Sequence, residues 1–209
     1  MKARVIFLSA LVFLGQSGLA QGFINLNFES AHITNGSIGL IDSTSGFPGW
    51  TVTPNYCIYD NLSLSGNSIS IFDTNAVYAA SPVQGKYKVF LNSGNYPGTG
   101  IPISIGQTGR IPITSQSITF WGSLGALQIT FDGQPLSFTE MSSTVNYSVY
   151  GADVSAFAGQ VGNLLFTLPP YDGYAIVDNI QFSSSPVPEP GQIALFALGG
   201  ALLGLRRKQ

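Results

Sequence analysis

Charged side chains are scarce in this chain of 209 residues. They make up 9% of it, against roughly 25% in ordinary soluble domains. Between residues 21 and 186 three basic side chains (Lys86, Lys88 and Arg110) face nine acidic ones, which leaves a net charge of −6. Because binding to a run of phosphates depends on Lys and Arg, this balance argues against a nucleic-acid partner.

Cysteine and histidine are nearly absent. Cys57 is the only cysteine, so no internal disulfide forms and a packed core must stabilise the chain. We interpret Cys57 as a free or buried thiol, with intermolecular pairing as the alternative. His32 is the only histidine and lies in a loop-like Ala-His-Ile-Thr-Asn-Gly stretch. No nucleophile elbow, zinc-protease motif or phosphate loop is present, and we expect no enzyme. A Ser/His/Asp arrangement or a glycosidase-like carboxylate pair is the alternative.

The first 20 residues have the three-part order of a secretory signal peptide. Basic residues come first, residues 5–14 form an apolar run apart from Ser9, and Gly18 and Ala20 are small residues suited to cleavage. An apolar run of this length is too short to cross a membrane comfortably. We therefore expect signal peptidase to remove residues 1–20, so that the mature chain begins near Gln21.

The C-terminal end also has the features of a membrane segment. Residues 183–190 form a polar linker that is rich in proline, residues 191–205 are apolar apart from Gln192, and residues 206–209 form a tail with three basic side chains. A helix over 191–205 rises about 22 Å, which is short against a hydrocarbon core of about 30 Å, but flanking cations can snorkel to the headgroups. The positive-inside rule places residues 206–209 in the cytoplasm and the body outside.

The linker ends in a four-residue motif. The motif consists of Val187, Pro188, Glu189 and Pro190, and it is followed by a short apolar helix and an end with Arg206 and Arg207. This three-part order resembles the PEP-CTERM sorting signal of Gram-negative bacteria. The resemblance implies handling by an exosortase, which is an inner-membrane, protease-like sorting enzyme, in a bacterium that makes extracellular polysaccharide. It also implies a transient inner-membrane precursor, then delivery to the cell surface or extracellular matrix. A plain C-terminal membrane anchor is the alternative.

Residues 21–182 are predicted to form one all-β domain, a jelly roll or β-sandwich. The runs 68–72 and 117–120 alternate strictly between polar and apolar residues, and five further runs are rich in β-formers: 86–91, 127–131, 136–140, 147–150 and 164–168. Asp132 and Gly133 form a hairpin-turn signal between two of them. Turn-forming residues interrupt the runs about every 8–12 residues, which is typical of sandwiches and jelly rolls.

Several segments of the body are similar to galactose-binding-like jelly rolls. Residues 25–29 and 46–50 resemble the opening of that fold, residues 150–160 its late turn before a strand that ends in Phe166, and residues 174–182 its closing strand. The resemblance implies a body like a carbohydrate-binding module. The whole pattern resembles small PEP-CTERM proteins that carry such a domain.

Asp178 is the most informative polar residue of the closing strand. In an extended strand it shares a face with Ile176, Ile180 and Phe182, which we interpret as the core face. An ionised carboxylate there is costly unless it is paired or bound to a metal, and basic partners are few. Many carbohydrate-binding jelly rolls hold a structural calcium through a first-strand glutamate and a last-strand aspartate, which the resemblance maps to Glu29 and Asp178. The alternative is that loop amides donate hydrogen bonds to Asp178.

Aromatic side chains offer a possible sugar platform, because flat rings with polar edges stack on pyranose faces, although core packing is their commoner role in a sandwich. The candidates are Trp50, Tyr56, Tyr59, Tyr96, Trp121, Tyr171 and Tyr174. Two functions are therefore open: a non-catalytic surface or matrix protein associated with exopolysaccharide, and a carbohydrate-binding module with a defined sugar site and structural calcium.

Overall fold

The structure is a computed structural model that describes residues 21–33, 39–54, 57–59, 67–74, 84–94 and 100–187. The predicted signal peptide, the predicted transmembrane helix and the basic tail lie outside these ranges, as do Pro188, Glu189 and Pro190. Within the described ranges, no helix has the length and apolarity needed to cross a membrane.

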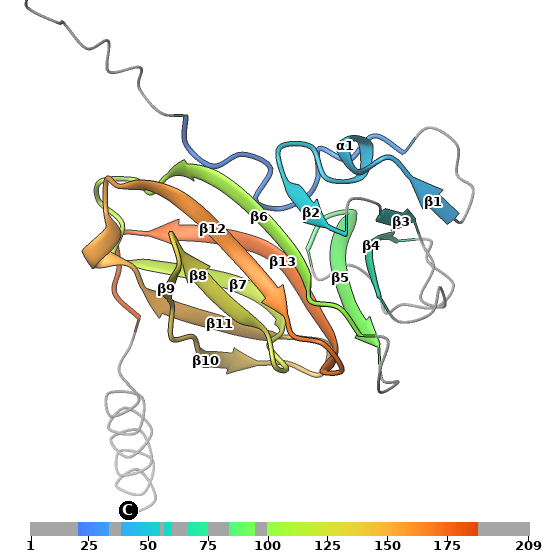
Figure 1. Cartoon of the computed structure of the whole chain (residues 1–209). Helices are drawn as coiled ribbons and strands as arrows, with labels where there is room; N and C mark the ends of the chain where they lie inside the picture. The colour runs from blue at the N-terminus through green and yellow to red at the C-terminus, as the bar shows by residue number, and fades with distance from the viewer. Residues whose placement is uncertain are drawn as a thin grey trace, which may run out of the picture.

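Two β-sheets pack face to face, so the prediction of an all-β sandwich is confirmed (Figure 1). The larger sheet has eight strands in the order β1 (Gly39–Ile41), β3 (Cys57–Tyr59), β4 (Ser68–Asp73), β5 (Tyr87–Gly94), β13 (Gly173–Ser183), β7 (Ser117–Ser123), β11 (Ser148–Asp153) and β10 (Thr139–Ser143). The smaller sheet has five in the order β2 (Thr51–Thr53), β6 (Ile103–Arg110), β12 (Val161–Leu168), β8 (Gln128–Phe131) and β9 (Gln134–Pro135). Neighbouring strands are antiparallel except for the parallel pair β3 and β4.

Helical structure in the described ranges is limited to two short turns, α1 (Ser43–Gly46) and the 3₁₀ turn Ser155–Phe157. Asp42 caps α1 by accepting a hydrogen bond from Thr44 N at 2.7 Å. Hydrogen bonds from the side chain and the backbone of Thr44 lower the pKa of Asp42, as expected for an ionised cap.

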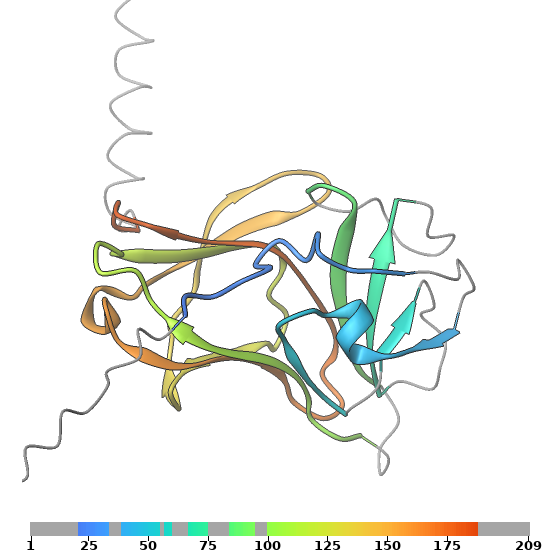
Figure 2. The ribbon, with the colours of Figure 1, turned by 90° about the horizontal axis from the view of Figure 1, so that it is seen from above.

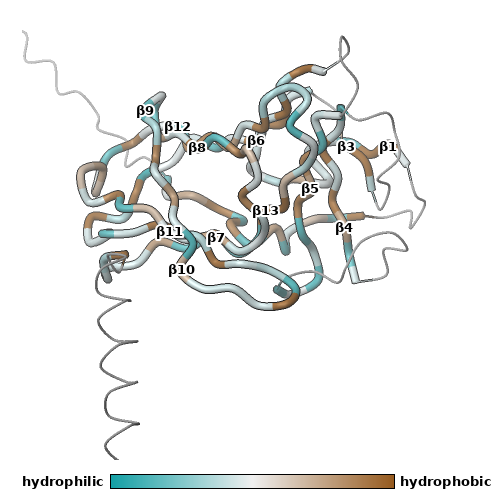
Figure 3. The backbone as a smooth tube through the Cα atoms, turned by 90° about the horizontal axis from the view of Figure 1, so that it is seen from below, coloured by the Kyte–Doolittle hydropathy of each residue, from teal (hydrophilic) through white to brown (hydrophobic). Residues whose placement is uncertain are grey.

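Alternation along the strands builds the core between the sheets, and Figure 3 shows hydrophobic and hydrophilic residues following one another along the tube. On β5, Val89 and Leu91 belong to the core, whereas Lys88 and Phe90 point to the outer face of the larger sheet. Every residue of β5 from Tyr87 to Leu91 is nevertheless buried, so this part of the outer face is also covered.

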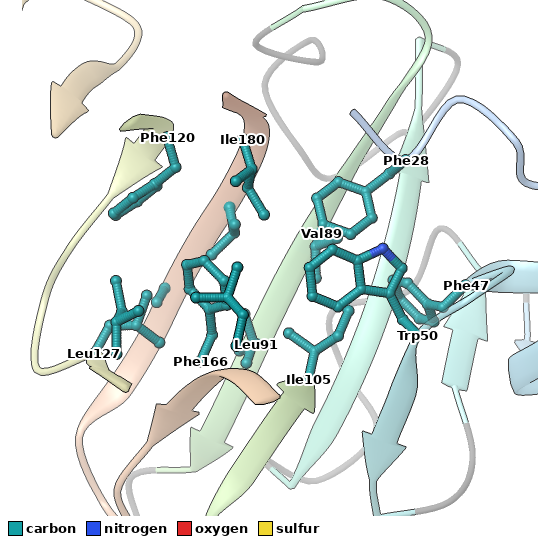
Figure 4. Packing of buried hydrophobic residues seen from close by; sticks show 14 of the residues in the cluster. Phe28, Phe47, Trp50, Val89, Leu91, Ile105, Phe120, Leu127, Phe166 and Ile180 are labelled. Atoms are coloured by element: carbon teal, nitrogen blue, oxygen red, sulfur yellow. The ribbon is translucent and has the colours of Figure 1, made fainter. Parts of the chain in front are cut away.

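Aromatic rings from both sheets meet at the centre of the core (Figure 4). Phe166 on β12 packs edge-to-face against Phe120 on β7, with ring centroids 5.9 Å apart. Phe166 also packs against Trp50, with ring centroids 6.4 Å apart. Trp50 in turn packs against Phe28, with ring centroids 5.3 Å apart. Phe28, Phe120 and Phe166 are fully buried, so this chain of rings joins the N-terminal segment to the two sheets.

The N-terminal segment bridges the sheets along one edge (Figure 2). The Gln107 side chain on β6 accepts a hydrogen bond from Ile24 N at 2.7 Å and donates one to Ile24 O at 3.0 Å. Ile180 N on β13 donates to Leu26 O at 2.9 Å. Residues just after the predicted cleavage point therefore belong to the folded body.

Most of the predicted strands are confirmed, including the alternating runs that became β4 and β7. Asp132 and Gly133 connect β8 to β9 with φ values of 48° and 78°, as a tight hairpin turn requires. The predicted run 136–140 is wrong in its first three residues, because β10 begins only at Thr139. Strand β6 was not among the predicted runs.

Candidate functional site

Glu29 lies against the segment that leads into β5. Its Oε1 atom accepts hydrogen bonds from Lys86 N at 2.8 Å and from Tyr87 N at 3.0 Å. A Cβ atom at Gly85 would lie 2.3 Å from the same oxygen, and Gly85 has a φ of +65°. Close approach of the carboxylate and the left-handed backbone both require glycine at this position.

Asp178 on β13 binds the beginning of the same segment. Its side chain accepts hydrogen bonds from Gln84 N at 2.9 Å and from Asn179 N at 2.6 Å, and the residue is fully buried. The structure thus brings Glu29 and Asp178 together on the backbone of residues 84–87. We call these two side chains the carboxylate pair.

Burial is the main electrostatic influence on Asp178, and it raises the pKa of that carboxyl to about 7. The hydrogen bonds from Gln84 and Asn179 and the positive charge of Lys88 oppose this rise, whereas the negative charge of Glu29 adds to it. Lys88 is itself almost completely buried, and burial lowers its pKa while Asp178 raises it. Each group therefore stabilises the charged form of the other.

The predicted orientation of Asp178 is wrong, because the core face of β13 carries Ala175 and Val177 rather than Ile176. The reason is a bulge in the pairing with β7 between Asp178 and Gln181, where Asn179 has a φ of 47°. Such a bulge inserts one residue and shifts the alternation that follows.

Before the bulge, Asp178 pairs directly with Trp121 on β7. Because Trp121 follows the core residue Phe120, it points to the outer face of the larger sheet. Asp178 is therefore buried on that outer face, beneath the segment that begins at Gln84, and not among the large apolar side chains of the core.

The surroundings of the carboxylate pair supply amide donors more than metal ligands. Calcium takes six to eight oxygen ligands, from carboxylates, carbonyls and water, and within the described ranges there is no group of three or more His, Cys, Asp or Glu side chains that could hold a metal ion. The alternative to calcium was a hydrogen bond from a loop amide to Asp178, and the structure contains one, from Gln84 N. Calcium binding by Glu29 and Asp178 stays a hypothesis.

The aromatic candidates divide into buried and exposed groups. Trp50 and Tyr59 are each only 7% exposed and belong to the core. Tyr171 and Tyr174, which are 43% and 59% exposed, lie at the turn between β12 and β13 and at the start of β13. Tyr56 and Tyr96 lie outside the described residues.

Two of the outward-facing rings are held in place by stacking. Tyr174 stacks on Phe90 with centroids 5.3 Å apart and an interplanar angle of 18°. Trp121 stacks on Tyr147 with ring centroids 5.0 Å apart and an interplanar angle of 7°. Tyr147 was not among the aromatic residues that the sequence suggested. A ring fixed in this way loses little conformational freedom when a sugar stacks on its open side.

Cys57 and His32 differ in their exposure to solvent. Cys57 is a free, fully buried thiol, and burial raises its pKa to about 12, so it is protonated at neutral pH. His32 is exposed, and its backbone N–H donates to Ser45 O at 2.9 Å.

The C-terminal end of β13 leads directly to the predicted sorting motif. Ser183 is the last residue of β13, and the chain still contacts the larger sheet at Ser185, whose carbonyl accepts a hydrogen bond from Ser117 Oγ at 2.7 Å. Residues 186–208 match the family model described as the PEP-CTERM protein-sorting motif. The chain carries a PEP-CTERM sorting motif.

This match covers all the predicted motif residues, from Val187 to Arg207. A PEP-CTERM motif implies an exported protein that an exosortase processes and sorts to the cell surface. The chain matches no curated protein. The similarity of the body to galactose-binding-like jelly rolls therefore stays a prediction beyond the observed β-sandwich.

Proposed function

We propose that the chain is a non-catalytic component of the cell surface or extracellular matrix that associates with exopolysaccharide. The observation that carries the proposal is the sorting motif, whose match begins at residue 186, three residues after the last strand of the β-sandwich ends. Signal peptidase removes residues 1–20, residues 191–205 hold the precursor transiently in the inner membrane, and the exosortase then acts at the motif.

The low charge of the body supports a neutral polysaccharide as the partner. Charged residues make up 9% of the chain, so few ionic groups need to lose water when the surface meets uncharged sugar. The exposed rings of Tyr171 and Tyr174 add stacking surface. Burial keeps the thiol of Cys57 protonated and away from solvent, which supports a non-catalytic role.

Mass spectrometry of both termini tests this proposal in a bacterium that expresses a PEP-CTERM exosortase. We expect the exported protein to begin near Gln21 and to have lost the segment that follows Pro190, whereas a strain without exosortase should retain that segment. Exported molecules that keep residues 191–209 in both strains would contradict sorting by the exosortase and favour a plain membrane anchor.

The second candidate is a carbohydrate-binding module with a defined sugar site, which the exposed and stacked ring of Tyr174 favours. On a glycan array this candidate predicts saturable binding to one class of sugar, and Tyr174→Ala should weaken that binding about fivefold, because stacking on one ring contributes of order 1 kcal/mol. Val145→Ala is the control, because Val145 is 98% exposed and is not aromatic. Weak binding without saturation would favour the matrix protein.

Calcium binding by the carboxylate pair is tested by thermal unfolding of the mature protein. If calcium binds there, a concentration of 100 times its Kd should stabilise the fold by about 2.7 kcal/mol, magnesium should not replace it, and Glu29→Gln and Asp178→Asn should each abolish the response. A Tm that does not change with chelator or calcium would remove Glu29 and Asp178 as metal ligands.

A further inference from the structure

The segment between β13 and the sorting motif lies on the larger sheet instead of leaving it. Gln116 N donates a hydrogen bond to Ser183 O at 2.8 Å, and Ser117 Oγ donates to Ser185 O at 2.7 Å. Ser185 N in turn donates to Ser183 Oγ at 3.0 Å. Ser117 is only 3% exposed, so water cannot easily replace its hydrogen bond.

Val187, the first residue of the motif, lies in a space that a glycine leaves open on β11. A Cβ atom at Gly151 would lie 3.2 Å from Val187 Cγ2 and 2.4 Å from Met141 Sδ. The φ of Gly151 is not in the left-handed region, so close approach rather than backbone conformation explains the glycine. Figure 1 shows this last coloured segment passing the end of β11.

These contacts are on the outer face of the larger sheet. Ala152 belongs to the core, so its neighbour Gly151 points the opposite way, beside Thr119 on β7 and Thr139 on β10. The surface formed by Ser117, Gly151 and Met141 is therefore a docking surface whose occupant is this chain's own segment 183–187, which we call the docked segment.

We propose that this docking surface controls access of the exosortase to the sorting motif, by holding Val187 against the sheet until the docked segment detaches. The inference rests on the proposed function. Cleavage of a folded segment requires local opening, and when opening and closing are fast, the rate follows the population of the open form. Each contact that holds residues 183–187 should therefore slow processing of the precursor.

Two substitutions weaken the docked segment without changing the motif. Ser117→Ala removes the hydrogen bond to Ser185 O, and Gly151→Val fills the space that Val187 occupies. Valine suits a β-strand, and its main clash besides Val187 is with the flexible end of Met141. Gly22→Ala is the control, because no atom lies within 4 Å of a Cβ atom at that position.

The experiment follows processing of the full-length precursor in cells that contain the exosortase, with a pulse of labelled protein and timed samples. The loss of one hydrogen bond of typical net strength should speed loss of the C-terminal segment about fivefold in Ser117→Ala. Gly151→Val should show at least as large an increase, and Gly22→Ala should process at the wild-type rate. The Tm of each mature variant shows whether it is folded.

A second readout does not involve the exosortase. Full-length precursor in detergent is treated with a protease of broad specificity, and mass spectrometry locates the cuts. Cuts between residues 183 and 187 should appear faster in both variants than in the wild type.

Two results would separate failure of the inference from failure of the proposed function. Equal processing of wild type, Ser117→Ala and Gly151→Val by an active exosortase, with all three folded, would overturn the inference and leave the proposed function intact. A wild-type precursor that the exosortase never processes would overturn both the proposed function and the inference that depends on it.

Discussion

Between pH 4 and pH 7, in the presence of chelator, the free energy of unfolding of the mature wild-type protein should fall by about 3 kcal/mol relative to Asp178→Asn. Burial raises the pKa of Asp178 from 3.8 to about 7. The folded state therefore binds this proton more tightly than the unfolded state does. Stability is highest while the unfolded state is also protonated, and it is lost as the pH rises through this window.

Denaturant titrations of both proteins across this pH range measure the effect. Asp42 and Asp153, whose pKa values are lowered by hydrogen bonds, act in the opposite direction, but they are present in both proteins and cancel. Asp178→Asn should show a constant offset, because its amide nitrogen cannot accept the hydrogen bond that one carboxylate oxygen accepts. If the free energies of unfolding of the two proteins changed with pH in parallel, Asp178 would be ionised throughout the range.

Replacement of Phe166 by alanine should destabilise the fold by about 3–5 kcal/mol, the range for deletion of a buried ring. Phe166 is fully buried and touches Phe120 of the larger sheet and Trp50 at the N-terminal end of the core. Its loss would leave a cavity where the two sheets meet, and rigid strands on both sides cannot close it.

In chemical denaturation, this loss should appear as a lower denaturant concentration at the midpoint of unfolding, with an unchanged dependence of the free energy on denaturant concentration. Val145→Ala serves as the control and should change stability by less than about 0.5 kcal/mol, because Val145 is 98% exposed. A loss below about 1 kcal/mol for Phe166→Ala would show that the two sheets can move together to fill the space.

Strands whose side chains alternate clearly were predictable from the sequence, and β6 was not. Residues 106–109 of β6 read Gly-Gln-Thr-Gly, which has no apolar member to mark a core face. The structure explains this composition: Gln107 forms hydrogen bonds with the backbone of Ile24. Gly109 also has the ring of Phe23 where a Cβ atom would be, at 2.8 Å. Both features depend on a segment more than 80 residues away, which no local pattern reveals.

The candidate site was predictable in its two acids but not in its geometry. The resemblance named Glu29 and Asp178 together as calcium ligands, which stays a hypothesis, whereas strand alternation gave the wrong face for Asp178, because a bulge at Asn179 interrupts it. Asparagine tolerates a positive φ better than most residues, but asparagine within a strand is not by itself a sign of a bulge. Apart from Asn179 N, the amides that donate hydrogen bonds to the two acids come from residues 84–87, whose side chains carry no signal for this role.

The strand that ends next to the sorting motif also determines how the body resists a pull from the membrane. Strand β13 lies in the middle of the larger sheet, hydrogen-bonded to β5 on one side and to β7 on the other, and its pairing with β7 reaches Ser183. Inter-strand hydrogen bonds run perpendicular to an antiparallel strand, so tension along β13 loads both ladders in shear, with many bonds sharing the force. A tail attached to an edge strand would instead peel the sheet open one bond at a time.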